Sequence, residues 1–241
     1  MSTPRTPLPQ TRDHSLCSQP VQNPGGPLLK PTPRSAPPLP LRTHHPPLTL
    51  QIVHGELTDT AKLAAAVAQS SVIVSLLGPQ VLRTPDPDVY AATYVSLFPM
   101  MRAQARPPRI LAMSTVSVVD AALDGWSLAR ALLVLLVRLV PGAYRAVTGI
   151  AAAFVERADG LEWTVFRIGG IPGGADEASW RADREDGEAY AGGVGKKGWM
   201  LAQRRGALAR WLVDQVENGQ EGWVGKMPAV SKLSASKWKI L

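Results

Sequence analysis

Cysteine is almost missing from this chain of 241 residues, since Cys17 is the only one. A single cysteine excludes an internal disulfide and a cysteine-based metal site, and it is typical of a reducing compartment. The first 30 residues contain no apolar stretch of the kind that a secretory signal needs, so we expect a cytoplasmic protein. His54 has no second histidine or carboxylate at ligand spacing, which predicts that the chain holds no metal.

Long apolar runs are also missing. The nearest is LARALLVLLVRLVPGAY, residues 128–144, which Arg130 and Arg138 interrupt and Pro141 closes. A membrane-spanning helix needs about 20 consecutive apolar residues. We therefore interpret this run as a buried helix, and we expect no membrane partner.

Aromatic residues make up only 6% of the chain, and the net charge of +7 is unevenly placed. Residues 1–47 carry five basic side chains against Asp13 alone, and they contain no aromatic residue. A nucleic-acid interface usually combines a basic surface with a recognisable binding motif or interleaved aromatic side chains. We therefore expect no nucleic-acid partner. The oligomeric state stays open.

Proline marks the start of the folded part, because residues 1–47 hold 13 of the 22 prolines. Proline removes a backbone donor and disfavours helix at the residue before it. We expect residues 1–47 to form a disordered, proline-rich leader and residues 48–241 to form a single domain. The stretch PRSAPPLPLR in this leader matches a polyproline ligand, although a loose tail is the simpler interpretation.

Strand-like and helix-like segments alternate from residue 48 onward. The β-rich runs are 48–55, 71–78, 109–115, 161–172 and 221–230, and the helical patterns are 57–70, 87–105, 126–140, 143–160 and 200–218. Thr58 or Asp59 is the expected N-cap of the first helix, and Pro99 predicts a kink or an early stop in the second. The run 71–78 is almost wholly apolar, which predicts a strand covered on both faces, whereas residues 175–198 predict a loop. The alternation predicts an α/β fold with a doubly wound, parallel, Rossmann-like sheet.

Small and hydroxyl-bearing residues follow the ends of these predicted strands. Open parallel sheets bind ligands beyond the carboxyl ends of their strands, where small residues let a ligand approach the backbone. This rule selects Gly55 and Glu56, residues 75–78, Ser114 and Thr115, and residues 167–170. The pattern predicts a ligand crevice at that end of the sheet.

Six segments in order resemble landmarks of one protein family. They are HGELTD, SVIVSLLGP, RILAMSTVSV, PGAYRAV, LEWTVFRIGGI and WVGKMPAVS. Together they resemble the atypical short-chain dehydrogenase/reductases, in particular the NmrA-like, NAD(P)H-binding branch that includes flavin and biliverdin reductase-like proteins. The likeness runs from about Arg42 to Ser231. It implies a Rossmann fold that holds NADP or NAD.

The resemblance also implies roles for individual residues. Glu56 and Leu57 match positions beside the adenine, and Leu77 and Gly78 match the strand end near the ribose. Ser114 and Thr115 match hydroxyls near the nicotinamide and the substrate, so they are candidate catalytic residues. Further candidates are Tyr144 as a catalytic residue and Arg167, Ile168 and Gly169 as the far wall of the nicotinamide pocket. For Arg167 a structural ion pair is an equal alternative, and for Tyr144 a helix-start packing role is the simpler one.

Two family features are missing. No Gly-x-x-Gly-x-x-Gly turn occurs in residues 1–47, and Gly25 and Gly26 do not replace it because no strand precedes them. Without that turn a dinucleotide loses the backbone donors that hold its pyrophosphate, so binding would be impaired and the sheet would be N-terminally incomplete. The Tyr-x-x-x-Lys pair is absent too, since Thr148 stands four residues after Tyr144.

Three functions stay open at this point. The first is hydride transfer between NADP or NAD and a small carbonyl, flavin-like or enone substrate. The second is a non-catalytic NmrA-like module that senses a dinucleotide or binds a partner protein. The third is a truncated, inactive homologue.

Overall fold

The computed structural model describes residues 50–79, 85–183, 188–218 and 221–234. The chain divides into residues 1–51 and residues 52–241, and the fold below is that of the second unit. The predicted proline-rich leader and Arg42 lie outside the described residues.

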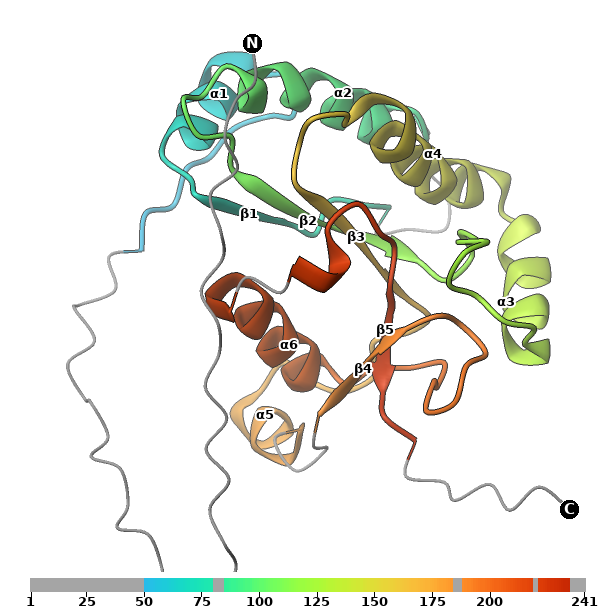
Figure 1. The fold of residues 1–241 in the computed structure, drawn as a ribbon. Coiled ribbons are helices and arrows are strands. Elements are labelled where there is room, and N and C mark those ends of the chain that lie inside the picture. Colours follow the sequence, from blue (N-terminus) through green and yellow to red (C-terminus); the bar gives the residue numbers. More distant parts are fainter. Residues whose placement is uncertain (1–49, 80–84, 184–187, 219–220, 235–241) are drawn as a thin grey trace, which may run out of the picture. The chain divides into compact units, whose positions relative to one another are not determined.

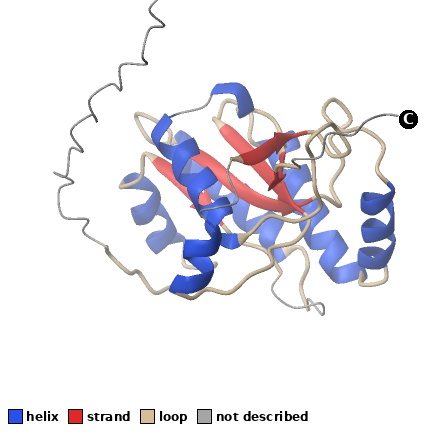
Figure 2. Cartoon of the chain, turned by 90° about the horizontal axis from the view of Figure 1, so that it is seen from below, coloured by secondary structure: helices blue, strands red, loops and turns tan. Residues whose placement is uncertain are grey.

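A five-stranded sheet forms the centre of this unit (Figures 1 and 2). Its order is β1-β2-β3-β5-β4, and the first four of these strands are parallel while β4 runs antiparallel to β5. The bounds are β1 Val72–Ser75, β2 Arg109–Thr115, β3 Trp163–Ile168, β4 Ala189–Gly192 and β5 Ala229–Lys232. Parallel neighbours joined by helical crossovers are the arrangement that the alternating sequence pattern predicts, and the predicted α/β class is confirmed.

Helices cover the two faces of the sheet unequally (Figure 1). On one face α1, α2 and α4 cover Ile110 and Val165 of the sheet, and Phe154 of α4 belongs to this cluster. On the other face α6 packs its Leu208 and Trp211 against Phe166. Burial of these apolar side chains supplies most of the driving force for the fold. The bounds are α1 Thr60–Ala68, α2 Val89–Arg102, α3 Leu128–Arg138, α4 Pro141–Arg157, α5 Glu177–Asp183 and α6 Arg205–Asn218.

Local sequence signals set several helix ends. Asp59 caps α1 by accepting a hydrogen bond from the backbone N–H of Lys62 at 3.2 Å, so the second of the two predicted caps is confirmed. Pro141 occupies the first turn of α4, where its missing N–H costs nothing. Pro99 lies inside α2, which continues to Arg102 beyond the predicted kink or stop.

Four predictions at the level of elements are wrong. Residues 50–55 form no strand, because a β-rich run becomes a strand only when a neighbour pairs with its backbone. Strand β1 is not covered on both faces, since Val74 is 40% exposed. The predicted loop 175–198 contains α5 and β4, and the ladder with β5 holds β4 in place.

The fourth correction concerns the apolar run that was predicted to be a buried helix. This run divides into α3 and α4, which are bent by 118° relative to each other, and α3 has no buried residue. Among the described residues, no single helix is long and apolar enough to cross a membrane; only this bent pair meets the criterion when its two helices are counted together.

Candidate functional site

A cavity of about 280 Å³ lies at the carboxyl ends of the parallel strands. Gly78 reaches it after β1, Ser114 and Thr115 at the end of β2, and Gly169 after β3, while α3 and α4 supply an apolar wall. This wall contains Leu133, Val137, Ala143, Val147 and Ile150. We call this cavity the strand-end pocket. It brings together four of the residues that the sequence singled out.

Three hydroxyl groups of the strand-end pocket differ in their hydrogen bonding. Ser114 is buried, and its Oγ donates to the carbonyl of Val147 at 3.1 Å, which ties β2 to α4. The Oγ1 of Thr115 accepts a hydrogen bond from the backbone N–H of Ser117 at 3.3 Å. Ser117 is only 2% exposed, yet its own Oγ has no hydrogen-bond partner among the described residues. A buried hydroxyl without a partner is costly, so Ser117 is the group best placed to bond a ligand.

Sequence reasoning did not select Ser117. It lies two residues beyond the predicted strand end, in the same STVS segment as Ser114 and Thr115. The available signal was a third hydroxyl in one short segment. Only the fold shows which of the three lacks a partner.

The two predicted glycines of the strand-end pocket have different surroundings. A Cβ added at Gly78 would have no atom within 4 Å, so open space adjoins its backbone. A Cβ at Gly169 would lie 2.1 Å from the carbonyl oxygen of Leu201, so the backbone of residue 201 excludes any side chain there. Gly169 is therefore explained by close backbone packing, and Ile168 beside it is buried in the core against α6.

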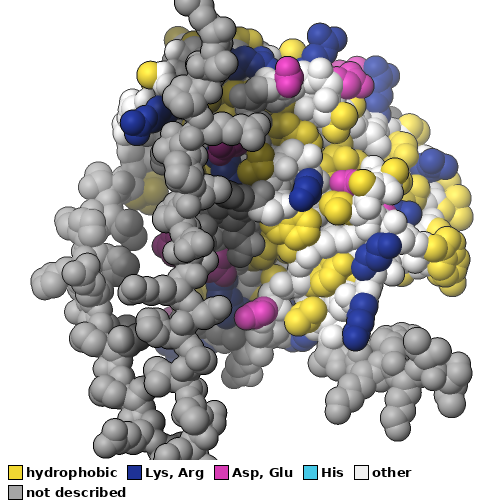
Figure 3. All heavy atoms as spheres, in the orientation of Figure 1, with side chains coloured by type: hydrophobic (Ala, Val, Ile, Leu, Met, Phe, Trp, Pro, Cys, Tyr) yellow, Lys and Arg dark blue, Asp and Glu magenta, His cyan; other side chains and the backbone are white. Residues whose placement is uncertain are grey.

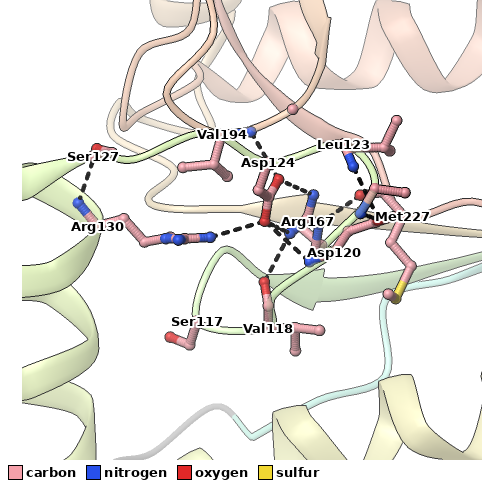
Figure 4. A network of polar contacts seen from close by, with 12 residues as sticks. Ser117, Val118, Asp120, Leu123, Asp124, Ser127, Arg130, Arg167, Val194 and Met227 are labelled. Atoms are coloured by element: carbon pink, nitrogen blue, oxygen red, sulfur yellow. Dashed lines mark hydrogen bonds and ion pairs between the residues drawn. The ribbon is translucent and has the colours of Figure 1, made fainter.

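Arg167 makes the structural ion pair that was one of its two predicted roles (Figure 4). Its guanidinium donates to both carboxylate oxygens of Asp124, at 2.7 and 2.8 Å, and to the carbonyl oxygens of Val118 and Met227. The side chain is wholly buried. Arg167 can therefore reach a ligand in the strand-end pocket only through its backbone.

Asp124 joins three segments through this network (Figure 4). It also accepts hydrogen bonds from Arg130 at 2.8 Å and from the backbone N–H of Val194 at 2.9 Å. Burial alone would raise the pKa of the Asp124 carboxyl, but the hydrogen bonds from Arg167 and from the backbone N–H of Asp120 and Val194 lower it overall. Asp124 is thus a buried carboxylate that fixes the loop after β2 against β3.

The remaining predicted residues lie outside the strand-end pocket. Tyr144 is half-buried near the start of α4, with the guanidinium of Arg138 5.4 Å from the centre of its ring. Leu57 and Leu77 line a separate apolar groove of about 220 Å³ beside β1, between α1 and α2. Glu56 lies in a more open hollow with Asp59. Because Leu77 and Gly78 are consecutive, the groove and the strand-end pocket adjoin each other just after the end of β1.

Two other observations bear on the chemistry. None of the described residues that line the strand-end pocket carries an ionisable side chain. In the described ranges there is also no group of three or more His, Cys, Asp or Glu residues that could hold a metal ion. A larger hollow of about 650 Å³ lies beside α6 and β4, but it is away from the carboxyl ends of β1, β2 and β3.

Comparison with known proteins identifies the architecture. No protein-family profile matches the chain, and no curated protein matches its sequence. Among solved structures, a candidate NADH-flavin reductase from Streptococcus pneumoniae TIGR4 is similar with a TM-score of 0.52 at 11% identity, over 80% of this chain and 85% of that one. An oxidoreductase from Lactococcus lactis is similar with a TM-score of 0.51 at 14% identity, over 75% of this chain and 70% of that one. The chain has a Rossmann-like fold.

Strand β1 lies at one edge of the described Rossmann-like sheet. Such sheets have the strand order 3-2-1-4-5-6 and bind dinucleotides where that order reverses. Among the described residues no strand pairs with the outer edge of β1, and the N-terminally incomplete sheet stays a prediction.

Proposed function

We propose that this chain is an atypical short-chain dehydrogenase/reductase of the NmrA-like type, which binds NADP or NAD with the nicotinamide end in the strand-end pocket. The observation that carries the proposal is the buried hydroxyl of Ser117, which has no hydrogen-bond partner among the described residues and lies in a cavity at the carboxyl ends of three parallel strands. Rossmann-like sheets place their ligands at this edge. The family resemblance favours the same class of cofactor, and so does the similarity to a candidate NADH-flavin reductase.

The residues of the strand-end pocket fit the nicotinamide end of such a cofactor. Ser117 offers a hydrogen bond to a carboxamide or to a substrate oxygen, and the space beside Gly78 admits a ring close to the backbone. Leu133, Val137 and Ala143 exclude water from the apolar side. When bound, a reduced nicotinamide supplies a hydride, and the protein orients the reactants.

For catalysis we propose a small carbonyl, flavin-like or enone substrate. Hydride addition to the electrophilic carbon of a carbonyl or enone requires one proton at the oxygen, and hydride addition to a ring nitrogen of a flavin requires one proton at a second ring nitrogen. Because none of the described lining residues has an ionisable side chain, we propose that this proton comes from water through the hydroxyls of Ser117 or Thr115. We therefore expect slow turnover. A positioned general acid raises the rate roughly 10²–10⁴-fold, and the described lining of the strand-end pocket contains no such group.

A non-catalytic module that senses a dinucleotide is the second candidate. The same lack of an ionisable group favours it, as does the position of Tyr144 outside the strand-end pocket. Because residues 1–47 contain no glycine-rich turn, we expect a weak pyrophosphate site both for the reductase and for the sensing module. A weak dinucleotide affinity is therefore expected whether or not the chain turns over.

Titration of the full chain with NADPH and NADH by calorimetry tests the proposal. We expect saturable binding, and we expect Gly78→Leu to abolish it by filling the open space beside the backbone. Gly222→Leu is the matched control, because a Cβ at Gly222 also has no atom within 4 Å but lies outside the strand-end pocket. Absence of saturable binding at millimolar cofactor contradicts both candidates.

A second experiment separates the enzyme from the sensor. NADPH oxidation is followed with quinones, flavins and aldehydes as acceptors. Turnover that Gly78→Leu abolishes supports the reductase. Binding of NADPH without turnover on any acceptor supports the sensing module.

A further inference from the structure

Helix α3 carries an apolar stripe that no part of the described structure covers. Leucines at spacings of four, three, one and three residues place this stripe along one side of the helix. Each is 54–74% exposed, and the adjoining Trp126 is 80% exposed. We call this surface the α3 stripe; its residues are Trp126, Leu128, Leu132, Leu135, Leu136 and Leu139.

The opposite side of α3 already has a function in the fold. Leu133 and Val137 lie on that side and line the strand-end pocket. The helix is thus held to the body by one side and presents the α3 stripe to its surroundings. Single exposed leucines are common on protein surfaces, but a contiguous stripe of five with a tryptophan marks an interaction surface.

The charged side chains around the α3 stripe are basic. No aspartate or glutamate occurs from Gly125 to Val155. The exposed Arg138 lies at one end of α3. At the other end, a Cβ on Gly125 would lie 3.5 Å from the Cδ of Lys196, so the basic loop with Lys196 and Lys197 adjoins the start of the stripe.

The two lysines of this loop are available to a partner. Both are exposed, and no ion pair of either occurs within the described ranges. Figure 3 shows hydrophobic side chains over α3 at the right edge, with Lys and Arg side chains beside them. The surface is therefore apolar along its centre and positive at its borders.

A second copy of this chain fits this surface poorly. A two-fold contact between α3 helices would bring the same basic borders together. With no carboxylate on α3 to pair with them, like charges would oppose the contact. An anionic lipid surface complements both the leucines and the cations.

We propose that the α3 stripe docks the protein on an anionic membrane surface, with α3 lying in the plane of the interface. Its 11 residues extend roughly 16 Å, about half of the ~30 Å hydrocarbon core, so the helix is suited to lie in the interface and not to span it. Tryptophan favours the headgroup level, which matches Trp126 at the start of the helix. The proposal replaces the expectation from sequence that the chain has no membrane partner.

The docked orientation would bring the strand-end pocket close to the lipid. Because α3 is the wall between the stripe and the pocket, a substrate or ligand dissolved in the bilayer would enter near Leu133 and Val137. This consequence does not depend on which cofactor the pocket holds.

Co-sedimentation of the full chain with lipid vesicles tests the proposal. We expect binding to vesicles that contain about 30% phosphatidylglycerol, a weaker signal with pure phosphatidylcholine, and loss of binding in high salt. Leu135→Glu should reduce the partition coefficient at least about tenfold, because it places a charge in the centre of the stripe. Lys196→Glu with Lys197→Glu should have a similar effect through the surface charge.

Matched variants distinguish this surface from others on the chain. Val213→Glu changes an exposed residue of α6, and Arg106→Glu with Arg157→Glu makes the same change of net charge away from α3. Both controls should bind like the wild type. The five basic residues of the leader are present in every variant, so unchanged binding of Leu135→Glu would assign the lipid contact to another segment and overturn the proposal.

Two further results would overturn it. The first is a wild-type chain that does not sediment with anionic vesicles. The second is a wild-type dimer in analytical ultracentrifugation that Leu135→Glu converts to a monomer, which would mean that a second copy covers the α3 stripe. Thermal unfolding followed by circular dichroism confirms that the variants are folded.

Discussion

Arg167 on β3 donates two hydrogen bonds to Asp124 in the loop after β2. They join its Nη1 to the Oδ2 of Asp124 at 2.7 Å and its Nη2 to the Oδ1 at 2.8 Å. The guanidinium is fully buried and the carboxylate is 3% exposed. Neither charge can be hydrated, so each depends on the other and on the surrounding hydrogen bonds. The pair fixes the loop that leads from the strand-end pocket to α3.

Asp124→Asn should destabilise the protein by about 3–5 kcal/mol, because it leaves the buried Arg167 without a counter-charge. Urea unfolding measures the change. Asp88→Asn is the control, since the pair of Asp88 with Arg145 is 58% and 67% exposed and should contribute roughly 0–1 kcal/mol. Equal losses in the two variants would contradict the assigned role of Asp124.

The same carboxyl makes the stability sensitive to acid. The pKa of Asp124 in the folded protein is below its ordinary value of 3.8. Its contribution is therefore complete above that value and is lost as the pH falls through the lowered pKa. The difference in unfolding free energy between wild type and Asp124→Asn should be constant at neutral pH and shrink below about pH 3.8. A difference independent of pH would show that the charge of Asp124 is not what matters.

Tyr94 should make the protein sensitive to alkali. Burial raises the pKa of its phenol to about 12. The hydrogen bond with Ser75, at 2.7 Å, lowers this pKa but does not offset the burial. Unfolded tyrosine ionises near 10, so stability is complete below pH 10 and falls by roughly 2–3 kcal/mol as the pH rises to 12. Tyr94→Phe should cost about 1 kcal/mol at neutral pH and remove this part of the alkaline loss. Unfolding of both proteins from pH 8 to 12 provides the comparison.

Gly169→Ala should destabilise the fold, since its Cβ would lie 2.1 Å from the carbonyl oxygen of Leu201. We expect a cost of about 1–3 kcal/mol in thermal or urea unfolding. Gly170→Ala is a neighbouring control with no atom within 4 Å of the new Cβ, and it should be within about 0.5 kcal/mol of the wild type. Unchanged stability of Gly169→Ala would leave ligand binding as the reason for the glycine.

Ser117→Ala should separate stability from binding. Because the Oγ of Ser117 has no partner among the described residues, its removal should leave the unligated protein unchanged or more stable by up to about 1 kcal/mol. Ser114→Ala should instead cost about 1 kcal/mol, through the lost bond to Val147. If the strand-end pocket binds NADPH, Ser117→Ala should weaken binding roughly tenfold. A loss of stability in the unligated Ser117→Ala protein would mean that the hydroxyl is satisfied within the fold.

Local patterns were sufficient for most of the elements. Strand β2 has the predicted bounds 109–115, and Asp59 caps α1, because apolar runs and capping residues act over a few neighbouring positions. The predictions failed where a distant partner decides the outcome. Residues 50–55 and 189–192 differ in this way, since within the described ranges only the second segment pairs with a neighbouring strand.

For the strand-end pocket, too, the sequence predicted the residues but not their partners. The rule for strand ends selected Gly78, Ser114, Thr115 and Gly169 from the sequence, and the fold places all four around one cavity. Whether these residues bind or catalyse stays a prediction. The partners of each group could not be read from the chain, because Ser114 bonds to a carbonyl 33 residues away and Gly169 is set by the backbone of residue 201.

The sequence alone determined the α/β class, the order of the segments and which strand-end residues meet at one edge of the sheet, because periodicity and chain direction are local properties. Tertiary structure decided which polar groups are satisfied and which apolar faces stay open. It placed Arg167 against Asp124, left Ser117 without a hydrogen-bond partner in the described part of the chain, and turned the α3 stripe outward. These outcomes depend on contacts between residues far apart in the chain, and no local pattern records them.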